Sequence, residues 1–217
     1  MDDAGDAFEL PMFPLGTVCF PHGVLPLQVF EPRYRALVAR CLASDGRFGV
    51  VLIERGSEVG GGDTRFSVGT IAQIAQAREL PDGRWALVSV GVERLAVREW
   101  LPDDPYPRAQ VVVWPDRAPP REAPAAAVTE AVDAVRTALV RVHALRAELG
   151  LPAHTGPVMT SAEDLTRASW EAAILAPLGP LDALALLGVD DPLARIERCV
   201  ELLGDEIEAL SFRLSAS

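Results

Sequence analysis

Lysine is absent from this sequence of 217 residues: all 20 basic residues are arginines, against 31 acidic residues, and the net charge is −11. A phosphate-binding P-loop needs a lysine that reaches the phosphates, so we interpret Gly60, Gly61 and Gly62 as part of a solvated loop. Proteins bind nucleic-acid backbones through clustered basic residues, and the arginines here are scattered among more numerous acids. The composition therefore disfavours a nucleic-acid partner.

Cysteine is scarce and long apolar runs are missing. Cys19, Cys41 and Cys199 are widely separated in apolar surroundings, which predicts buried free thiols and no disulfide framework. No run of ~18 apolar residues occurs, so we expect no membrane-spanning segment. The acidic N-terminus lacks the basic and apolar regions of a secretory signal. We therefore expect a cytoplasmic protein with no membrane partner.

Metal and nucleophile motifs are also missing. Cys19 and His22 have the spacing of two zinc ligands, but a structural zinc site needs four ligands and no second pair follows. We favour a buried thiol and a histidine in a turn, and we expect neither a metal nor another cofactor. His143 neighbours an apolar helical stripe and is predicted to be solvated. Neither H-E-x-x-H nor G-x-S-x-G occurs, so we predict no catalytic residue and no enzyme.

What the sequence has instead is an opening stretch, Leu10 to Leu42, in which prolines are interspersed with apolar residues. Proline in a sheet is confined to strand ends, edges and bulges, so this stretch predicts short extended segments joined by sharp corners. After Pro32 the apolar spacing changes to that of one helical face. The residues on this face are Tyr34, Leu37, Val38, Cys41 and Leu42.

The N-terminal half continues as short apolar segments of the length of strands. A turn at Leu80–Arg84 separates two of them, and Gly91 is predicted to mark a bulge or bend. We expect about six or seven strands in a mostly antiparallel barrel or sandwich. The later segments are Phe48–Ile53, Phe66–Leu80, Trp85–Val90, Leu95–Trp100 and Ala109–Trp114.

The C-terminal half is predicted to be helical. The proline-rich connector from Pro115 to Glu122 indicates a boundary between a β-rich domain, residues 1–117, and a helical domain, residues 118–217. One helix follows Pro124 and ends at Gly150. Ser161, with Asp164, has the pattern of a capping box for the next helix, which ends at Pro177. A short helix spans Pro180–Leu187, and Asp191 caps the last helix.

That last helix carries an apolar stripe at strict three and four spacing. Such a seam could pair two subunits as a coiled coil and give a homodimer. The alternative is packing within a four-helix bundle of the same chain, which we favour because three partner helices are available. The stripe consists of Leu193, Ile196, Val200, Leu203, Ile207, Leu210 and Leu214.

The stretch FPLGTVCFPHGVLPLQVFEPRY (Phe13–Tyr34) resembles the opening of the Lon protease N-terminal, or substrate-binding, domain family, and in particular its stand-alone bacterial members. The resemblance continues through FSVGTIAQIAQARELPDGRWALVSVGVERLAV (Phe66–Val97). It implies an α+β protein: a PUA-like β pseudobarrel with one inserted helix, followed by the helical bundle. Lon's ATPase module and Ser–Lys catalytic pair both need lysines, so the resemblance implies the recognition part alone.

The candidate binding residues are Phe30, Glu31, Arg33 and Tyr34, where a strand leads into the inserted helix. One interpretation is structural. The carboxylate of Glu31 would be stabilised near the helix N-terminus, Arg33 would pair with Glu31, and Glu31–Tyr34 would cap and hold the inserted helix in place. The other is functional: these residues line a groove that accepts a peptide. The resemblance implies non-catalytic recognition of polypeptide clients or of a partner protein.

Two alternatives stay open. A small ligand-binding protein or minor enzyme on the same scaffold would need a pocket with convergent polar groups. An RNA-binding protein would need a contiguous arginine face.

Overall fold

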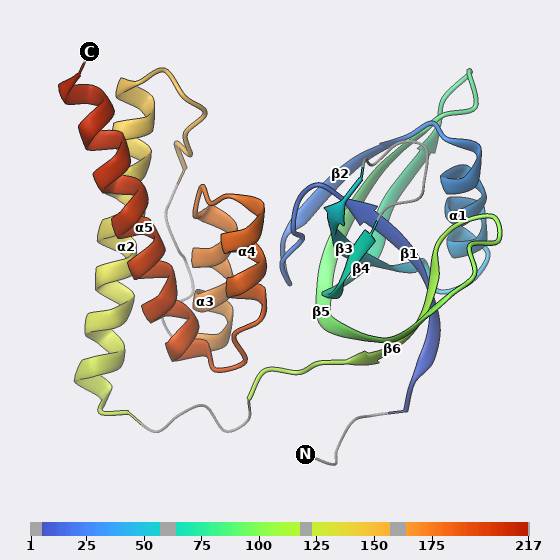
Figure 1. The fold of residues 1–217 in the computed structure, drawn as a ribbon, viewed down its shortest axis with the longest axis horizontal. Helices are drawn as coiled ribbons and strands as arrows, with labels where there is room; N and C mark the ends of the chain where they lie inside the picture. The colour runs from blue at the N-terminus through green and yellow to red at the C-terminus, as the bar shows by residue number, and fades with distance from the viewer. Residues whose placement is uncertain (1–5, 57–63, 118–122, 157–163, 217) are drawn as a thin grey trace. The chain divides into compact units, whose positions relative to one another are not determined.

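The protein forms two compact units, Met1–Pro115 and Asp116–Ser217, which we call the β unit and the helical unit. The structure is a computed structural model that describes residues 6–56, 64–117, 123–156 and 164–216. The expected glycine loop at residues 60–62 lies outside these residues. Figure 1 shows the strands and the first helix in the β unit, and the other helices in the helical unit.

The β unit contains six strands and one helix among its described residues. The helix α1 (Pro32–Leu42) begins with its proline in the first turn and buries Tyr34, Leu37, Val38 and Cys41, the face that the spacing predicts. The strands are β1 (Phe8–Leu15), β2 (Val24–Val29), β3 (Arg47–Arg55), β4 (Thr64–Glu79), β5 (Trp85–Leu101) and β6 (Arg108–Val113).

These strands form one sheet in the order β2-β5-β4-β3-β1-β6, and β6 also pairs with β5. The β1–β3 pair is parallel and the other pairs are antiparallel. β6 joins the Phe8–Pro11 half of β1 to the Leu95–Leu101 half of β5, which closes the barrel there. β2 pairs with β5 over Trp85–Val90. Among the described residues no strand joins β2 to β1, so the barrel stays open between them.

β5 corrects one prediction. The two expected strands on either side of Gly91 are one strand of 17 residues. The predicted bulge at Gly91 is nevertheless present, because the register with β4 shifts between Ile71 and Ala72, opposite this glycine. A Cβ on Gly91 would lie 2.1 Å from the carbonyl oxygen of Phe20, so only glycine lets the two backbones approach this closely.

Packing in the β unit centres on Phe13, whose ring stacks on Tyr34 with centroids 4.2 Å apart and contacts Phe48. Cys19 and Cys41 are buried nearby as free thiols, as predicted, and Cys199 is a buried free thiol of the helical unit. Burial raises the pKa of all three thiols to about 12 because a thiolate is poorly solvated there.

The helical unit contains α2 (Ala125–Glu148), α3 (Leu165–Leu175), α4 (Pro180–Leu187) and α5 (Pro192–Ser215) among its described residues. Gly150 follows α2 with φ +67°, the left-handed conformation that favours glycine after a helix. The capping-box prediction is wrong in its detail: Asp164 itself is the N-cap and accepts a hydrogen bond from the Arg167 N–H. Ser161 lies outside the described residues.

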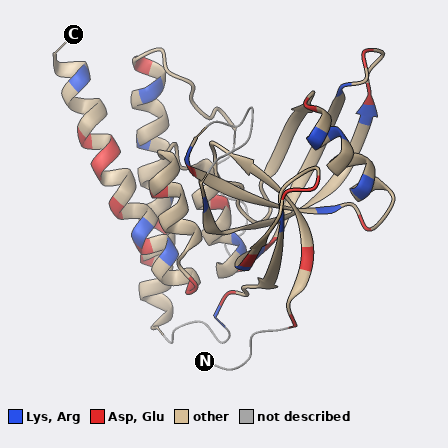
Figure 2. Ribbon diagram, turned by 45° about the vertical axis from the view of Figure 1, so that its right-hand side comes forward, with Lys and Arg blue, Asp and Glu red and all other residues tan. Residues whose placement is uncertain are grey.

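The apolar stripe of α5 packs within its own chain. Leu193, Ile196, Leu203 and Leu210 are buried, and α2 and α5 lie side by side (Figure 1). The helix bundle within the chain therefore buries the same apolar residues that a coiled-coil dimer would need at its interface. Figure 2 shows acidic and basic residues interspersed along α5, which is typical of a solvated outer face. The predicted α+β class, with a β-rich part followed by helices, is confirmed.

Candidate functional site

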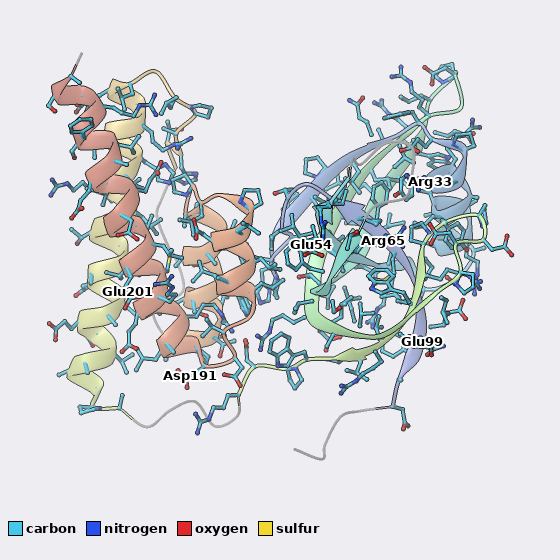
Figure 3. The ribbon with its side chains drawn as sticks, in the orientation of Figure 1. Arg33, Glu54, Arg65, Glu99, Asp191 and Glu201 are labelled. Carbon is cyan, nitrogen blue, oxygen red and sulfur yellow. The ribbon has the colours of Figure 1, made fainter. Side chains whose placement is uncertain are left out.

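The four predicted site residues lie where β2 ends and α1 begins. Glu31 is the N-cap residue, but its side chain makes no capping hydrogen bond. Its carboxylate instead accepts a hydrogen bond from Arg33 Nε at 3.1 Å. The Arg33 guanidinium lies over the Tyr34 ring, 4.4 Å from its centroid. Figure 3 shows Arg33 on α1. The expected Glu31–Arg33 pair is present, and the carboxylate cap is not.

A pocket of about 180 Å³ opens beside these residues. Phe30, Glu31 and Tyr34 line it, whereas Arg33 does not and packs against Tyr34. We call it the β1–β2 pocket because its other walls come from the two strands between which the barrel is open. The lining residues that the structure describes are Phe13, Leu15, Pro26, Leu27, Gln28, Val29, Phe30, Glu31 and Tyr34.

The size of the β1–β2 pocket limits what can fill it. Small-molecule sites in proteins typically enclose ~300–1,000 Å³, so 180 Å³ is too small for most metabolites. A single large apolar side chain is a better match. Among the described lining residues Glu31 alone is charged, and Arg33 already pairs with it.

The surface next to the pocket is apolar and uncharged. Phe30 is 53% exposed and Val24, at the other end of β2, is 68% exposed. Between them Pro26 and Gln28 are also exposed. From Leu10 to Phe30 the sequence contains no aspartate, glutamate, lysine or arginine. An exposed strand with these properties is a potential binding surface, because large apolar side chains are usually covered.

A second hollow of about 480 Å³ in the β unit has a different character. Arg40, Ser44, Asp45 and Arg47 line it together with Glu9 and apolar residues of β1, and none of the predicted site residues does. Asp45 accepts a hydrogen bond from the Arg47 backbone N–H, 3.2 Å away. This hollow has four charged side chains among its described lining residues, whereas the β1–β2 pocket has one.

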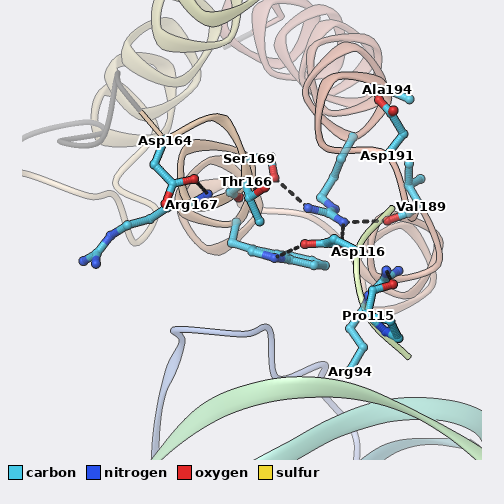
Figure 4. Close-up of polar contacts among 12 residues, drawn as sticks. Arg94, Pro115, Asp116, Asp164, Thr166, Arg167, Ser169, Val189, Asp191 and Ala194 are labelled. Atoms are coloured by element: carbon cyan, nitrogen blue, oxygen red, sulfur yellow. Dashed lines mark hydrogen bonds and ion pairs between the residues drawn. The ribbon is translucent and has the colours of Figure 1, made fainter. Parts of the chain in front are cut away.

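The helical unit contains a buried polar network that the sequence analysis missed. Arg195 is fully buried; its guanidinium pairs with Asp116 and donates hydrogen bonds to Ser169 Oγ at 2.6 Å and to the Val189 carbonyl at 2.7 Å. Trp170 donates its indole N–H to Asp116 at 3.0 Å, and its ring lies under Arg195. Figure 4 shows the contacts around Asp116.

The helical spacing of Arg195 could have predicted this network from the sequence. Arg195 lies three residues after Pro192 and four before Cys199, both buried on the same face of α5. A charged residue on a buried helical face must be paired, because an isolated buried charge is very costly. The network joins the start of the unit to α3 and α5, which is a structural role.

His143 corrects another prediction, because it is buried rather than solvated. Its Nε2 lies 2.9 Å from the Leu175 carbonyl, and its Nδ1 accepts the His154 backbone N–H at 3.1 Å. This pattern requires the neutral tautomer with the proton on Nε2. Burial lowers the pKa of His143 below its ordinary value of 6.5, and the nearby His154 and Arg146 act in the same direction.

The described part of the chain contains no group of three or more histidine, cysteine, aspartate or glutamate residues that could hold a metal ion. Cys19 is buried, and His22 sits in a turn with φ +65°. None of the described helices is long and apolar enough to cross a membrane.

The pseudobarrel, the helix inserted after β2 and the helical unit together define a Lon N-terminal-type protein. The family model of the ATP-dependent protease La (LON) substrate-binding domain matches residues 9–205. The chain therefore belongs to the LON substrate-binding domain family. This domain is neither the ATPase nor the protease part of Lon.

Individual relatives agree with this assignment. Lon protease from Koribacter versatilis is 27% identical over 98% of this chain and 26% of its own length. Lon protease 2 from Herpetosiphon aurantiacus is 35% identical over 52% of this chain and 14% of its own length. The chain thus spans about a quarter or less of the curated relatives that it matches.

Two solved structures are similar over most of the chain. A Lon N-terminal domain protein from Xanthomonas campestris has a TM-score of 0.63 and 26% identity, and the match covers 89% of this chain and 98% of that one. The N-terminal domain of the Mycobacterium avium complex Lon protease has a TM-score of 0.57 and 20% identity, with coverage of 91% and 99%, and supports the fold alone.

Proposed function

We propose that this protein is a non-catalytic recognition module that binds unfolded polypeptide segments at the β1–β2 pocket and the exposed face of β2. The observation that carries this proposal is the apolar pocket of about 180 Å³ beside the exposed Phe30. Membership of the LON substrate-binding domain family supports a polypeptide as the ligand. Phe30, Glu31 and Tyr34 contact the ligand, and Arg33 holds Glu31 and Tyr34 in place.

The binding energy comes from apolar burial. Burying one large apolar side chain contributes about 1.5–3 kcal/mol. A single pocket of this size therefore gives weak binding on its own, which suits a protein that samples many exposed segments. In a folded client such side chains are already buried, so the pocket discriminates in favour of unfolded chains.

The other two candidate functions receive less support. The β1–β2 pocket is smaller than typical small-molecule sites, and its described lining residues include a single charged one, Glu31. RNA binding would need a basic face, and the stretch from Leu10 to Phe30 contains no arginine.

The proposal is tested by measuring the binding of a fluorescently labelled, permanently unfolded polypeptide and of a mixed-sequence single-stranded RNA, at low and at high salt. We expect binding of the polypeptide that persists at high salt, because apolar burial is not screened. We expect no comparable binding of RNA. RNA binding that falls steeply with salt, without polypeptide binding, would contradict the proposal.

Two phenylalanine variants locate the surface. Phe30→Ser should weaken polypeptide binding about tenfold, since it removes most of one large side chain from the contact. Phe212→Ser is the matched control, because Phe212 is 74% exposed and lies on α5 of the helical unit. Both variants should fold normally, since neither residue is in a core. Equal effects of the two variants would place the binding surface elsewhere.

A further inference from the structure

The backbone of β2 has one side turned to β5 and one side turned away. Gly91 donates its backbone N–H to the Gly23 carbonyl at 2.9 Å, so the carbonyl of Gly23 points toward β5. Peptide groups alternate in direction along an antiparallel pair. The backbone N–H and C=O groups of Leu25, Leu27 and Val29 therefore point toward β5. The backbone groups of Val24, Pro26 and Gln28 point away from β5, and we call this side of the strand the β2 edge.

Pro26 agrees with this assignment. Proline has no N–H, so it is tolerated in a strand at a position where the N–H would point out of the sheet. At the β2 edge it costs no hydrogen bond to β5. The edge thus presents the N–H groups of Val24 and Gln28 and the carbonyls of Val24, Pro26 and Gln28. Within the described part of the chain, no strand pairs with these groups.

The β2 edge lacks the usual protection against pairing with another chain. Edge strands are commonly protected by charged side chains, often lysine, or by a covering loop or helix. Here residues 10–30 contain no aspartate, glutamate, lysine or arginine, and Val24 and Phe30 are exposed. Pro26 is the single blocking residue on the edge. A strand left this accessible is suited to accept a partner.

The charge pattern also defines the partner. A charged side chain placed against the β2 edge would lose hydration without meeting an opposite charge, because the edge is neutral and Glu31 is already paired with Arg33. An uncharged segment loses nothing in this way. A helix, moreover, satisfies its own peptide groups and would leave those of the β2 edge unpaired.

We propose that the occupant of this site is an uncharged, extended polypeptide segment that adds to the β2 edge as a strand and inserts one large apolar side chain into the β1–β2 pocket. This inference rests on the proposed function and specifies its ligand. The pocket lies directly beside the edge, since Pro26, Leu27, Gln28 and Val29 line it. Side chains alternate along a strand, so every second residue of the added segment faces the pocket.

The test uses a blocked, uncharged seven-residue peptide of alternating valine and serine with a central phenylalanine, coupled to a soluble fluorophore. Two derivatives carry N-methyl groups on alternate amides, one on the odd positions and one on the even positions. The phenylalanine fixes which face of the peptide meets the pocket, so one set of amides points at the β2 edge and the other points away. Each derivative is the control for the other.

We expect one derivative to bind about tenfold or more weakly than the unmethylated peptide, because it loses the hydrogen bonds to the edge. The other should bind within about twofold of it. In the complex, hydrogen exchange of the Gln28 amide should slow. Equal losses for both derivatives, or no loss for either, would overturn strand addition while leaving polypeptide recognition intact. Failure of the unmethylated peptide to bind would overturn the proposed function as well.

Discussion

The β unit and the helical unit differ in how their exposed apolar side chains are distributed. In the β unit, exposed Val24 and Phe30 lie at the two ends of β2, and Phe30 lines the β1–β2 pocket; Phe8, Leu42 and Val92 are exposed elsewhere. In the described part of the helical unit, each helix exposes a single large apolar residue: Val140, Ile174, Leu181 and Phe212. Isolated exposed apolar residues are normal on a protein surface, whereas exposed apolar residues along an uncharged strand that ends at a pocket suggest binding.

Each unit also buries an arginine. In the β unit, Arg94 donates a hydrogen bond to the Pro115 carbonyl. In the helical unit, Arg195 pairs with the partly buried Asp116 and donates to Ser169 Oγ, and the Trp170 indole N–H donates to Asp116. Such a network stabilises one particular arrangement of the helices. The comparison supports placing the proposed site where apolar groups are left uncovered, and it assigns a structural role to the buried cluster around Arg195.

The largest expected effect tests the structural role of this cluster. Arg195→Ala removes a fully buried arginine and leaves the partly buried Asp116 without its charge partner, so we expect a loss toward the lower end of the about 3–5 kcal/mol that breaking a buried pair costs. We expect the helical signal in circular dichroism to be lost at a much lower urea concentration. Arg198→Ala is the control: it breaks a solvent-exposed pair with Glu201 on the same helix, worth about 0–1 kcal/mol. Similar effects of both variants would show that the network does not stabilise the unit.

A smaller effect is expected from adding one methyl group to each unit. Gly91→Ala places a Cβ against the Phe20 carbonyl in the β unit, so the backbone must shift, and we expect a loss of about 1–3 kcal/mol. Gly204→Ala meets no atom within 4 Å in α5. It should stabilise the helical unit by about 0.5–1 kcal/mol. Urea unfolding followed by tryptophan fluorescence and by circular dichroism measures the two changes. Stabilisation by Gly91→Ala would refute the close contact.

The smallest effect concerns pH. The pKa of His143 is lowered in the folded protein, so below about pH 6.5 the unfolded chain binds its proton first, and the stability of the helical unit falls as the pH falls. Protonation also places a second donor at Nδ1, opposite the His154 N–H. His143→Gln should flatten this pH dependence, measured as the free energy of unfolding against pH. If the free energy of unfolding of the variant depended on pH as steeply as that of the original protein, His143 would not be the cause.

The sequence predicts the fold well where local chemistry decides the conformation. Pro32 and the spacing of Tyr34 and Leu37 determine α1, and Asp191 caps α5 as expected. It predicts less where distant segments meet. Nothing near Gly91 in the sequence reveals that Phe20 approaches it and that β5 continues through it.

The candidate site follows the same rule. The sequence indicates Phe30, Glu31 and Tyr34, but Phe13 and Leu15 enter the pocket only through the pairing of β1 with β3 and of β2 with β5. The opening of the barrel is a property of the whole sheet, because it depends on which halves of β1 and β5 are joined by β6. No local pattern encodes it.

The most direct test of polypeptide recognition by β2 is a backbone-amide NMR titration of the protein with the unfolded polypeptide. We predict shifts at Val24, Gln28, Phe30 and Tyr34 that saturate together, and no comparable shifts at exposed positions of α5 around Phe212. Shifts confined to the helical unit, with β2 unchanged, would contradict the account.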